Sequence, residues 1–415
     1  MSIYEQGQVI KRKKMRITPF SFSVAILLFI NLMLQENAFG FHLKAIWIYV
    51  MDLGVIFVGI IDYFTKRSTI RVKDIKENAR FLIPFVVVTI YSIVLNCLNN
   101  KLPFEEILTT GLYWIIPIVA AIIIYLDVNI LGVQIIYNII LLNYTVVILK
   151  CSSVEGSSYF FHLSTYTDNF GSLLEVHPIG LALPLFLIYF LFEHYQNKKK
   201  LGWKFWIGVL YTFMCGKRIA LVGMIAVLIV YYVLRKSPKR FEKAQLRIYM
   251  GIVFFMTFAY LLFVKYNGIQ YIAQLFGVNT MTRLETWGAL KDSYTISPLF
   301  AGNGVGYSMY YLNNLGGIYI NGFLNKIGDV HNDILKTYVD VGFFLFIYFM
   351  WYLLIGNLKF FVKKKCVDTA LLYFLLMVYT VFLMFVDNIM RYDLYLLTLF
   401  LITMSYRKKE EESDR

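Results

Sequence analysis

The chain has 415 residues, of which 59% are hydrophobic and 16% are charged, and its mean hydropathy is +0.63. This polar fraction is too small to cover the surface of a soluble globular protein. The composition therefore excludes a soluble globular protein and indicates an integral membrane protein. The net charge of +14 does not indicate nucleic-acid binding, because the basic residues fall in short clusters between apolar runs. Such clusters orient membrane helices.

The cysteines show no paired short spacing, which argues against a disulfide framework or a cysteine metal site; they are Cys97, Cys151, Cys215 and Cys366. The N-terminus has a basic stretch at residues 11–16, followed by an apolar run without a small-residue cleavage site. We therefore expect the first span to remain as an anchor.

Twelve segments are candidate membrane spans, because a helix needs about 20 apolar residues to cross the hydrocarbon core. In chain order they begin near Thr18, Leu43, Phe81, Leu108, Ile130, Ile179, Phe205, Ile219, Ile248, Ile334, Ala370 and Tyr392. The seventh, residues 205–214, is short and lies only four residues before the eighth, so the pair is either a tight hairpin or one broken helix. The prediction is an all-α polytopic bundle of about twelve spans.

The basic residues test this count, because alternate connections should be rich in Lys and Arg. An even count places 29 of the 40 Lys and Arg residues in segments 11–16, 66–80, 198–204, 235–247, 359–365 and 407–415. These segments and both termini are then expected in the cytoplasm. We expect a single transmembrane domain over residues 1–415.

Two outer connections are long, residues 150–176 and residues 265–336. Loops of such length between packed spans are usually functional or disordered. The second contains an amphipathic stretch, residues 281–294, with apolar side chains at helical spacing: Leu284, Trp287, Leu290 and Tyr294. Residues 265–336 are therefore expected to form a large, partly helical outer loop against the membrane surface.

Few basic groups remain on the outer side, and these are Lys217, Arg218, Arg283, Lys291, Lys326 and Arg391, together with His331. A cluster of cations there suits an anionic ligand, and the guanidinium fork of arginine can bind phosphate bidentately. The alternative is that each side chain snorkels or pairs with a local acid such as Glu285 or Asp292.

Arg218 is the strongest candidate among these cations. It follows Gly216 and Lys217 and opens the eighth span, so it lies at a helix N-terminus, where the helix dipole and free N–H groups favour an anion. Two adjacent cations there need a negative partner, which is either a ligand or an acidic side chain of the protein.

His331 lies directly before the tenth span. Imidazole titrates near neutral pH and can accept a proton from a sugar hydroxyl, as a general base in glycosyl transfer must do. The alternative is a hydrogen-bonding loop histidine, with Asn332 or Asp333 capping the helix that follows.

Two other features carry weaker indications. Residues 302–306, Gly-Asn-Gly-Val-Gly, fail the G-x-G-x-x-G pattern because Tyr307 stands where glycine is required, so we interpret them as a turn without a ligand. Asp52, near the middle of the second span, is a functional candidate by its depth. It either binds a coupling ion or proton, or hydrogen-bonds to a polar residue such as Asn31, Asn138 or Asn143.

Three motifs follow one another between residues 216 and 342. They are Gly216-Lys217-Arg218 with Leu221 at a helix start, Arg283-Leu284-x-x-Trp287 running into Pro298-Leu299-Phe300-x-Gly302-x-Gly304-x-Gly306, and His331-Asn332-x-x-Leu335 ending at Gly342. Their order resembles the bacterial Wzy-type polysaccharide polymerase and O-antigen ligase superfamily. Outside these residues the likeness rests on hydropathy, span number and loop position.

The resemblance implies a GT-C-like membrane glycosyltransferase without a cofactor or metal. An acceptor sugar hydroxyl attacks the anomeric carbon of a glycan carried on undecaprenyl diphosphate, and the lipid diphosphate leaves. His331 aligns with the proposed base, and Arg218 and Arg283 align with the arginines that bind the diphosphate. Lys217 departs from the family's small hydroxyl residue and adds charge to this clamp.

The supporting residues expected around this site are Trp287, Asn332, Asp333 and Arg391. A second departure is Leu345, which replaces a glycine that commonly follows Gly342. The resemblance further implies a bacterial inner or plasma membrane location, membrane lipid as surroundings, and partners such as a flippase and a chain-length regulator, with no nucleic acid.

Three alternatives to a repeat-unit polymerase stay open. A ligase uses the same donor with another acceptor, a flippase moves lipid-linked sugars without joining them, and a scaffold has no catalytic role. A transporter is less favoured, because transporters tend to have internal repeats and midplane ionisable groups, and this chain has only Asp52 at that depth and no detectable repeat.

Overall fold

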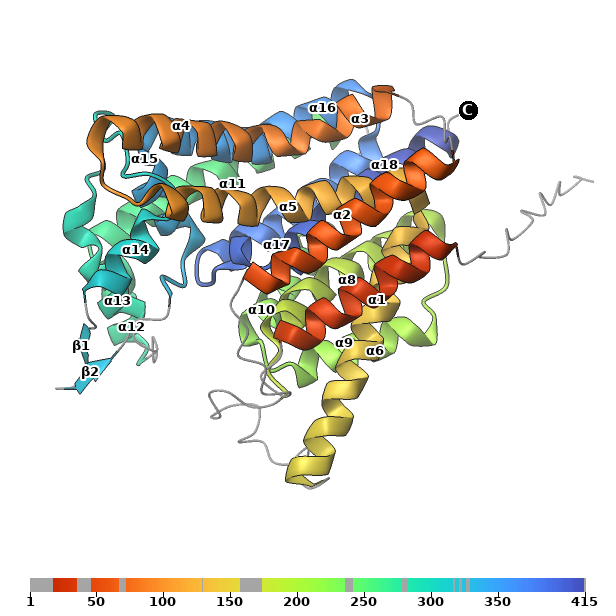
Figure 1. Ribbon diagram of the computed structural model, residues 1–415. Helices are drawn as coiled ribbons and strands as arrows, with labels where there is room; N and C mark the ends of the chain where they lie inside the picture. The colour runs from red at the N-terminus through yellow and green to blue at the C-terminus, as the bar shows by residue number, and fades with distance from the viewer. Residues whose placement is uncertain are drawn as a thin grey trace, which may run out of the picture.

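The computed structural model describes residues 18–35, 46–66, 72–128, 130–156, 174–235, 242–277, 283–315, 318–320, 323–325 and 329–413. Figure 1 shows these residues as a bundle of long helices, with a group of short elements at one end. The bundle confirms the predicted all-α polytopic class.

The long helices are α1 (Pro19–Gln35), α2 (Ile46–Lys66), α4 (Ile83–Asn99), α5 (Phe104–Val128), α6 (Ile130–Glu155), α8 (His177–Asn197), α9 (Trp203–Met214), α10 (Arg218–Arg235), α11 (Glu242–Lys265), α15 (Asp333–Trp351), α17 (Val367–Met384) and α18 (Asp393–Ser413). The shorter elements are α3 (Val72–Ala79), η2 (Arg80–Leu82), α12 (Gly268–Leu275), α13 (Arg283–Ala289), η5 (Lys291–Ser293), α14 (Tyr307–Asn314), β1 (Ile318–Ile320), β2 (Phe323–Asn325), η6 (Tyr352–Gly356), α16 (Asn357–Lys363) and η7 (Ile389–Arg391).

All twelve segments predicted as spans are helical where the structure describes them. Within those residues, eight helical stretches are long and apolar enough to cross a membrane by length and composition. The remaining predicted spans are α1, α2, α9 and α18. With 12 residues, α9 is only about 18 Å long, shorter than the hydrocarbon core.

The α9–α10 pair is a tight hairpin rather than one broken helix. A Cβ atom on Gly208 would lie 3.2 Å from Leu187, and one on Gly180 would lie 3.1 Å from Cys215. Because higher numbers in one helix meet lower numbers in the other, α9 runs antiparallel to α8. On α10, Tyr231 contacts the ring of Phe192 near the far end of α8, so α10 runs back alongside it.

Ion pairs gather predicted cytoplasmic segments at one end of the bundle. They are Lys364–Glu77 (2.6 Å), Arg407–Glu77 (3.6 Å), Lys408–Asp74 (3.8 Å) and Lys199–Glu193 (2.5 Å). In Figure 1 the start of α1 and the end of α18 lie towards this same end. This arrangement agrees with the alternation expected from the basic clusters.

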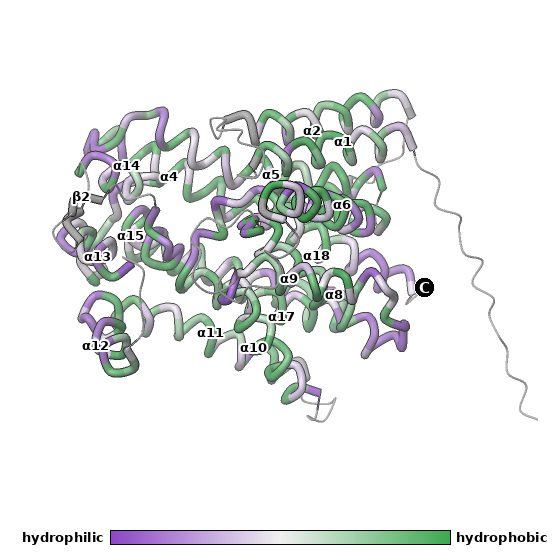
Figure 2. Tube along the Cα trace, turned by 90° about the horizontal axis from the view of Figure 1, so that it is seen from below, coloured by the Kyte–Doolittle hydropathy of each residue, from purple (hydrophilic) through white to green (hydrophobic). Residues whose placement is uncertain are grey.

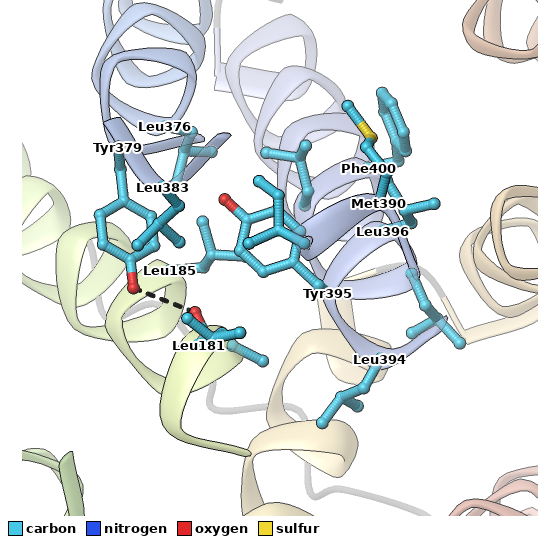
Figure 3. Close-up of a cluster of buried hydrophobic side chains, with 14 of the residues drawn as sticks. Leu181, Leu185, Leu376, Tyr379, Leu383, Met390, Leu394, Tyr395, Leu396 and Phe400 are labelled. Atoms are coloured by element: carbon cyan, nitrogen blue, oxygen red, sulfur yellow. Dashed lines mark hydrogen bonds between the residues drawn. The ribbon is translucent and has the colours of Figure 1, made fainter. Parts of the chain in front are cut away.

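The apolar core lies between α5, α8, α17 and α18. Figure 3 shows leucines of α8 and α17 packed around Tyr395, and the Tyr379 hydroxyl donating a hydrogen bond of 3.1 Å to the backbone carbonyl of Leu181. That bond satisfies a polar group buried in the core. Figure 2 shows hydrophobic colouring along most helices and polar colouring at α13, α14 and the C-terminal end.

The glycine-rich turn packs directly on a kink in α15. Gly342 has φ 77°, outside helical geometry, and a Cβ there would lie 2.3 Å from the backbone carbon of Ala301. Gly302, with φ 90°, is equally tight against Val341. Both positions require glycine because two backbones touch. The predicted turn is confirmed.

The segment between α11 and α15, which is predicted to lie on the outer side, is folded as α12, α13, η5, α14 and a two-stranded antiparallel hairpin, in which Tyr319 pairs with Leu324. The sequence did not predict this hairpin. Trp287, Leu290 and Tyr294 are buried, which confirms the predicted apolar face. In the other outer segment, α6 continues to Glu155, and residues 157–173 lie outside the described residues.

Replacing Glu410 with alanine should lower the free energy of unfolding by about 1–2 kcal/mol. Its carboxylate accepts hydrogen bonds from the backbone N–H groups of Asp368 (3.0 Å) and Thr369 (2.8 Å) and from the Thr369 hydroxyl (2.5 Å), which caps the first turn of α17. The midpoint of thermal unfolding in detergent measures the loss. The exposed Glu412 is the matched control, and an equal shift in Glu412→Ala would contradict the capping role.

Candidate functional site

Four connections at the end of the bundle opposite these ion pairs bring charged side chains together. Asp387, after α17, lies 3.6 Å from Nδ1 of His331 and 3.9 Å from Nζ of Lys217. The Lys217 ammonium also lies 3.1 Å from the Glu175 carboxylate, which is 3.6 Å from Nε2 of His177. We call Glu175, His177, Lys217, His331 and Asp387 the outer cluster, after the side on which the basic clusters predict this end of the bundle to lie.

Asp387 is the centre of the outer cluster, and its side chain is only 2% exposed. Burial alone raises the pKa of a carboxyl group, but the His331 ring and the Lys217 ammonium outweigh burial and hold the pKa of Asp387 well below its usual range. The carboxylate therefore stays ionised at neutral pH. A fixed negative charge beside Nδ1 favours a proton on that nitrogen and leaves Nε2 free to accept one.

Backbone hydrogen bonds fix the Asp387 connection to the start of α15. The N–H of Asp333 donates to the carbonyl of Asp387 (3.2 Å), and the N–H of Met390 donates to the Asp333 carboxylate (2.8 Å). The N–H of Asn332 donates to the Asn388 side chain (3.2 Å). Since the two residues directly after His331 are bonded to the connection that carries Asp387, these bonds fix the backbone of His331 relative to Asp387 from that side.

His331 itself has φ 49°, a left-handed conformation that only the surrounding contacts can maintain. The indole N–H of the buried Trp287 donates to the carbonyl of Val330 (2.8 Å). On the other side, the Asn332 side chain accepts from the N–H of Leu335 (2.9 Å), so it caps α15. The imidazole remains 41% exposed, so a substrate can reach it.

The α9–α10 turn places Lys217 in the outer cluster. Gly216 has φ 66°, which lets the chain turn before α10. A Cβ on Gly180 of α8 would lie only 3.0 Å from Cγ of Lys217, so this glycine allows the lysine side chain to approach α8 closely. The lysine side chain is thereby held against α8 and is only 11% exposed.

Arg391 lies beside the outer cluster and is paired. Its guanidinium is 2.6 Å from the carboxylate of Asp329, two residues before His331. Burial lowers the pKa of Arg391, but the Asp329 charge outweighs burial and raises it. The pair ties η7 to the segment that carries His331, so Arg391 joins Trp287, Asn332 and Asp333 in contacting that segment.

The two arginines expected to bind diphosphate lack the ion pairs that Lys217 has. Arg218 is exposed, and neither it nor Arg283 has an ion pair with another described residue. Arg283 is close enough to the Tyr260 hydroxyl to interact with it electrostatically. That hydroxyl accepts from the Asn332 side chain (2.9 Å) and donates to the carbonyl of Phe385, so Arg283 borders the same two connections.

The remaining predicted residues are placed away from the outer cluster or not described. Lys291 donates to the Asn267 side chain (3.2 Å), which is a local structural contact. Lys326 lies outside the described residues. Asp52 is fully buried, and its carboxylate lies 3.5 Å from the Asn31 amide, which also donates to Asp393 (2.7 Å). The hydrogen-bonding alternative for Asp52 therefore has an observed partner in Asn31.

Sequence reasoning missed Asp387, Glu175, His177 and Asp329. Each lies at a helix end or in a short connection, where a polar residue is ordinary, and none belongs to a recognisable motif. Among the described residues, no group of three or more His, Cys, Asp or Glu side chains could hold a metal ion. The arrangement instead offers two imidazoles, each 3.6 Å from a carboxylate, with unpaired arginines nearby. The carboxylate beside His331 is the buried Asp387, whereas the one beside His177 is Glu175, which is also paired with Lys217.

Fold and site together define a multi-pass helical membrane protein with an ionic, substrate-accessible site at one end of its bundle. Residues 203–350, which include Lys217, Arg218, Arg283 and His331, match the family model described as O-antigen ligase. This match supports membership of the O-antigen ligase superfamily, which includes the Wzy-type polymerases. Membership implies glycan transfer in the membrane. No curated protein matches the chain.

Proposed function

We propose that the protein is a Wzy-type polymerase of a bacterial inner or plasma membrane, with both termini in the cytoplasm. It joins oligosaccharide repeat units carried on undecaprenyl diphosphate into a surface polysaccharide at the outer face. The observation that carries this proposal is the exposed His331 imidazole beside the buried Asp387 carboxylate, within the segment that matches the family model.

In the proposed reaction, an acceptor sugar hydroxyl of one lipid-linked unit attacks the anomeric carbon of another. The new C–O bond forms as the bond between that carbon and the phosphate oxygen breaks, and the diphosphate leaves with the electron pair. Nε2 of His331 accepts the hydroxyl proton, and Asp387 stabilises the resulting imidazolium. The proton is later released to water.

The cations of the site have different roles, because only a cation without an ion pair in the protein can stabilise the negative charge on the leaving diphosphate. Diphosphate is already a good leaving group, so cations that stabilise its negative charge lower the barrier. Lys217 and Arg391 are each neutralised by a carboxylate within 3.1 Å. We therefore assign diphosphate binding to Arg218 and Arg283, whose guanidinium groups have no ion pair among the described residues, and assign Lys217 to positioning Asp387.

Replacing Arg218 with glutamine should raise KM for the lipid-linked donor by about tenfold, because one charge-assisted phosphate contact is lost. Initial rates of glycan transfer at varied donor concentration measure KM. Lys217→Gln, which removes an already paired charge, should instead lower kcat. Equal effects of both changes on KM would contradict the division of roles.

Replacing Trp287 with phenylalanine should lower glycan transfer by about tenfold and the free energy of unfolding by about 1 kcal/mol, since the carbonyl of Val330 loses its buried partner. Measurements are the transfer rate and the thermal midpoint in detergent. The control is Trp206→Phe, at a side chain that is 61% exposed. Full activity in Trp287→Phe would show that this bond does not position His331.

A ligase is the second candidate, because the matching family model carries that description. Polymerase and ligase share the donor and differ only in the acceptor. Purified protein incubated with one defined undecaprenyl-diphosphate oligosaccharide should give a ladder of products if it is a polymerase. A single transfer, seen only when another acceptor is added, identifies a ligase. No product in either case would favour a flippase or a scaffold.

A further inference from the structure

A second polar site lies at the far end of α8 from the outer cluster. α8 has 21 residues, about 30 Å in length, with His177 at its first position. Near its other end, a pocket of ≈ 360 Å³ is lined by α6, α8, the connection that follows α8 and the start of α9. We call it the head pocket. It shares no residue with the outer cluster.

The head pocket carries excess positive charge. Its lining includes Lys199, Lys200 and Lys204 but only one acid, Glu193. That acid is already paired with Lys199 at 2.5 Å and with Lys409. Lys204 donates to the neutral Asn138 side chain (2.8 Å), and Lys200 has no ion pair with another described residue. Two ammonium groups are therefore left for an anion.

An apolar groove continues from the head pocket. A second cavity of ≈ 280 Å³ shares Asn138, Trp203 and Lys204 with it and extends between α6 and α9 past Leu142 and Ile207. Leu142 is 57% exposed and Trp203 is 68% exposed, so this groove opens to the surroundings of the bundle. In a bilayer those surroundings are acyl chains, and tryptophan is typical of the headgroup level.

The combination of two cations with an adjoining apolar groove fits one chemical class. A soluble phosphate would use the head pocket but leave the groove empty, whereas a lipid with a negative headgroup occupies both. We propose that the head pocket and groove bind an anionic glycerophospholipid, with its phosphate against Lys200 and Lys204 and one acyl chain between α6 and α9. The lipid stabilises the α6–α9 packing by mass action.

The test compares lipid retention by the full-length protein in detergent, counted by native mass spectrometry. Wild type should retain phosphatidylglycerol in preference to phosphatidylcholine. The double variant Lys200→Gln/Lys204→Gln should weaken phosphatidylglycerol binding about 30-fold, from the typical contribution of two lysines at an anionic surface. Lys363→Gln/Lys365→Gln removes the same charge from an exposed connection elsewhere and should leave binding unchanged.

The groove is tested separately with Leu142→Trp, whose larger side chain fills the cavity. This variant should weaken binding of phosphatidylglycerol, and soluble glycerol 3-phosphate should compete poorly with the lipid for wild type. All variants should keep the wild-type thermal midpoint without lipid, which excludes misfolding. The proposal is overturned if both lysine pairs weaken binding equally, if neither does, or if glycerol 3-phosphate competes as well as the lipid.

Discussion

Replacing His331 with alanine should abolish long glycan chains and leave lipid-linked single repeat units accumulating on the outer side of the membrane. The His331 side chain is 41% exposed, and its Nδ1 lies 3.6 Å from the ionised Asp387 carboxylate, which stabilises the imidazolium formed when Nε2 accepts a proton. A general base commonly contributes 10²–10⁴-fold to a rate, so we expect a loss of about that size. Gel separation of surface polysaccharide and analysis of extracted lipid-linked glycans measure the two pools.

The control for this experiment is His194→Ala. His194 lies at the opposite end of α8, where its ring contacts the backbone carbonyl of Lys199 (2.6 Å). This variant should form polymer as wild type does. Immunoblotting of membranes should show equal amounts of both variants. Unchanged polymer length and yield in His331→Ala would eliminate the catalytic role, although a scaffold would remain compatible with that result.

The helices could be predicted from sequence because span formation depends on local hydropathy. Every predicted span is helical where described, and the basic clusters correctly grouped the segments around Glu77 and Glu193. The turn at residues 302–306 was also predictable from its glycines. The packing of this turn against Gly342 was not predictable, because the close approach of two backbones depends on tertiary packing. Tertiary packing does not change the hydropathy pattern of the sequence.

For the candidate site as well, the residues with a local sequence signal could be predicted, and the residues brought together by tertiary packing could not. His331 could be singled out because it stands before a span on a side poor in cations. Its partner Asp387 lies 56 positions later, shortly after the end of α17, in a context typical of any helix end. For Lys217 the sequence left either a ligand or an acidic side chain as the negative partner. The structure shows Lys217 paired with Glu175, an acid that the sequence did not connect to it.

As a result of these pairings, charge is neutralised at the centre of the outer cluster but not everywhere around it. The carboxylates at its centre compensate the buried cations, and Arg391 beside it is paired with Asp329, whereas Arg218 and Arg283 have no ion pair with another described residue. A buried ion left without a partner is costly, so the interior of such a site must be neutralised by the protein itself. Arg218 is exposed and Arg283 is half-buried, so water can solvate both guanidinium groups until an anionic ligand binds. This division is the physical basis for separating positioning residues from diphosphate-binding residues.

Replacing Asp387 with asparagine should lower kcat for glycan transfer by about 10²-fold while changing KM for the donor little. The amide keeps the size of the side chain and removes the charge that stabilises the His331 imidazolium. The backbone carbonyl of residue 387 can still accept from Asp333, so the connection should keep its shape. Initial rates at varied donor concentration separate kcat from KM.

A structural role for Asp387 predicts a different pattern from a positioning role. If Asp387 acts only through His331, then Asp387→Asn should cause no further loss in a His331→Ala background, because the two residues act as one unit. If Asp387 merely holds Lys217 in place, the two losses should multiply and the thermal midpoint should fall in both backgrounds. Residual rates of the single and double variants, measured on one defined donor, therefore decide between these roles. Multiplicative losses would refute the proposal that Asp387 orients the base.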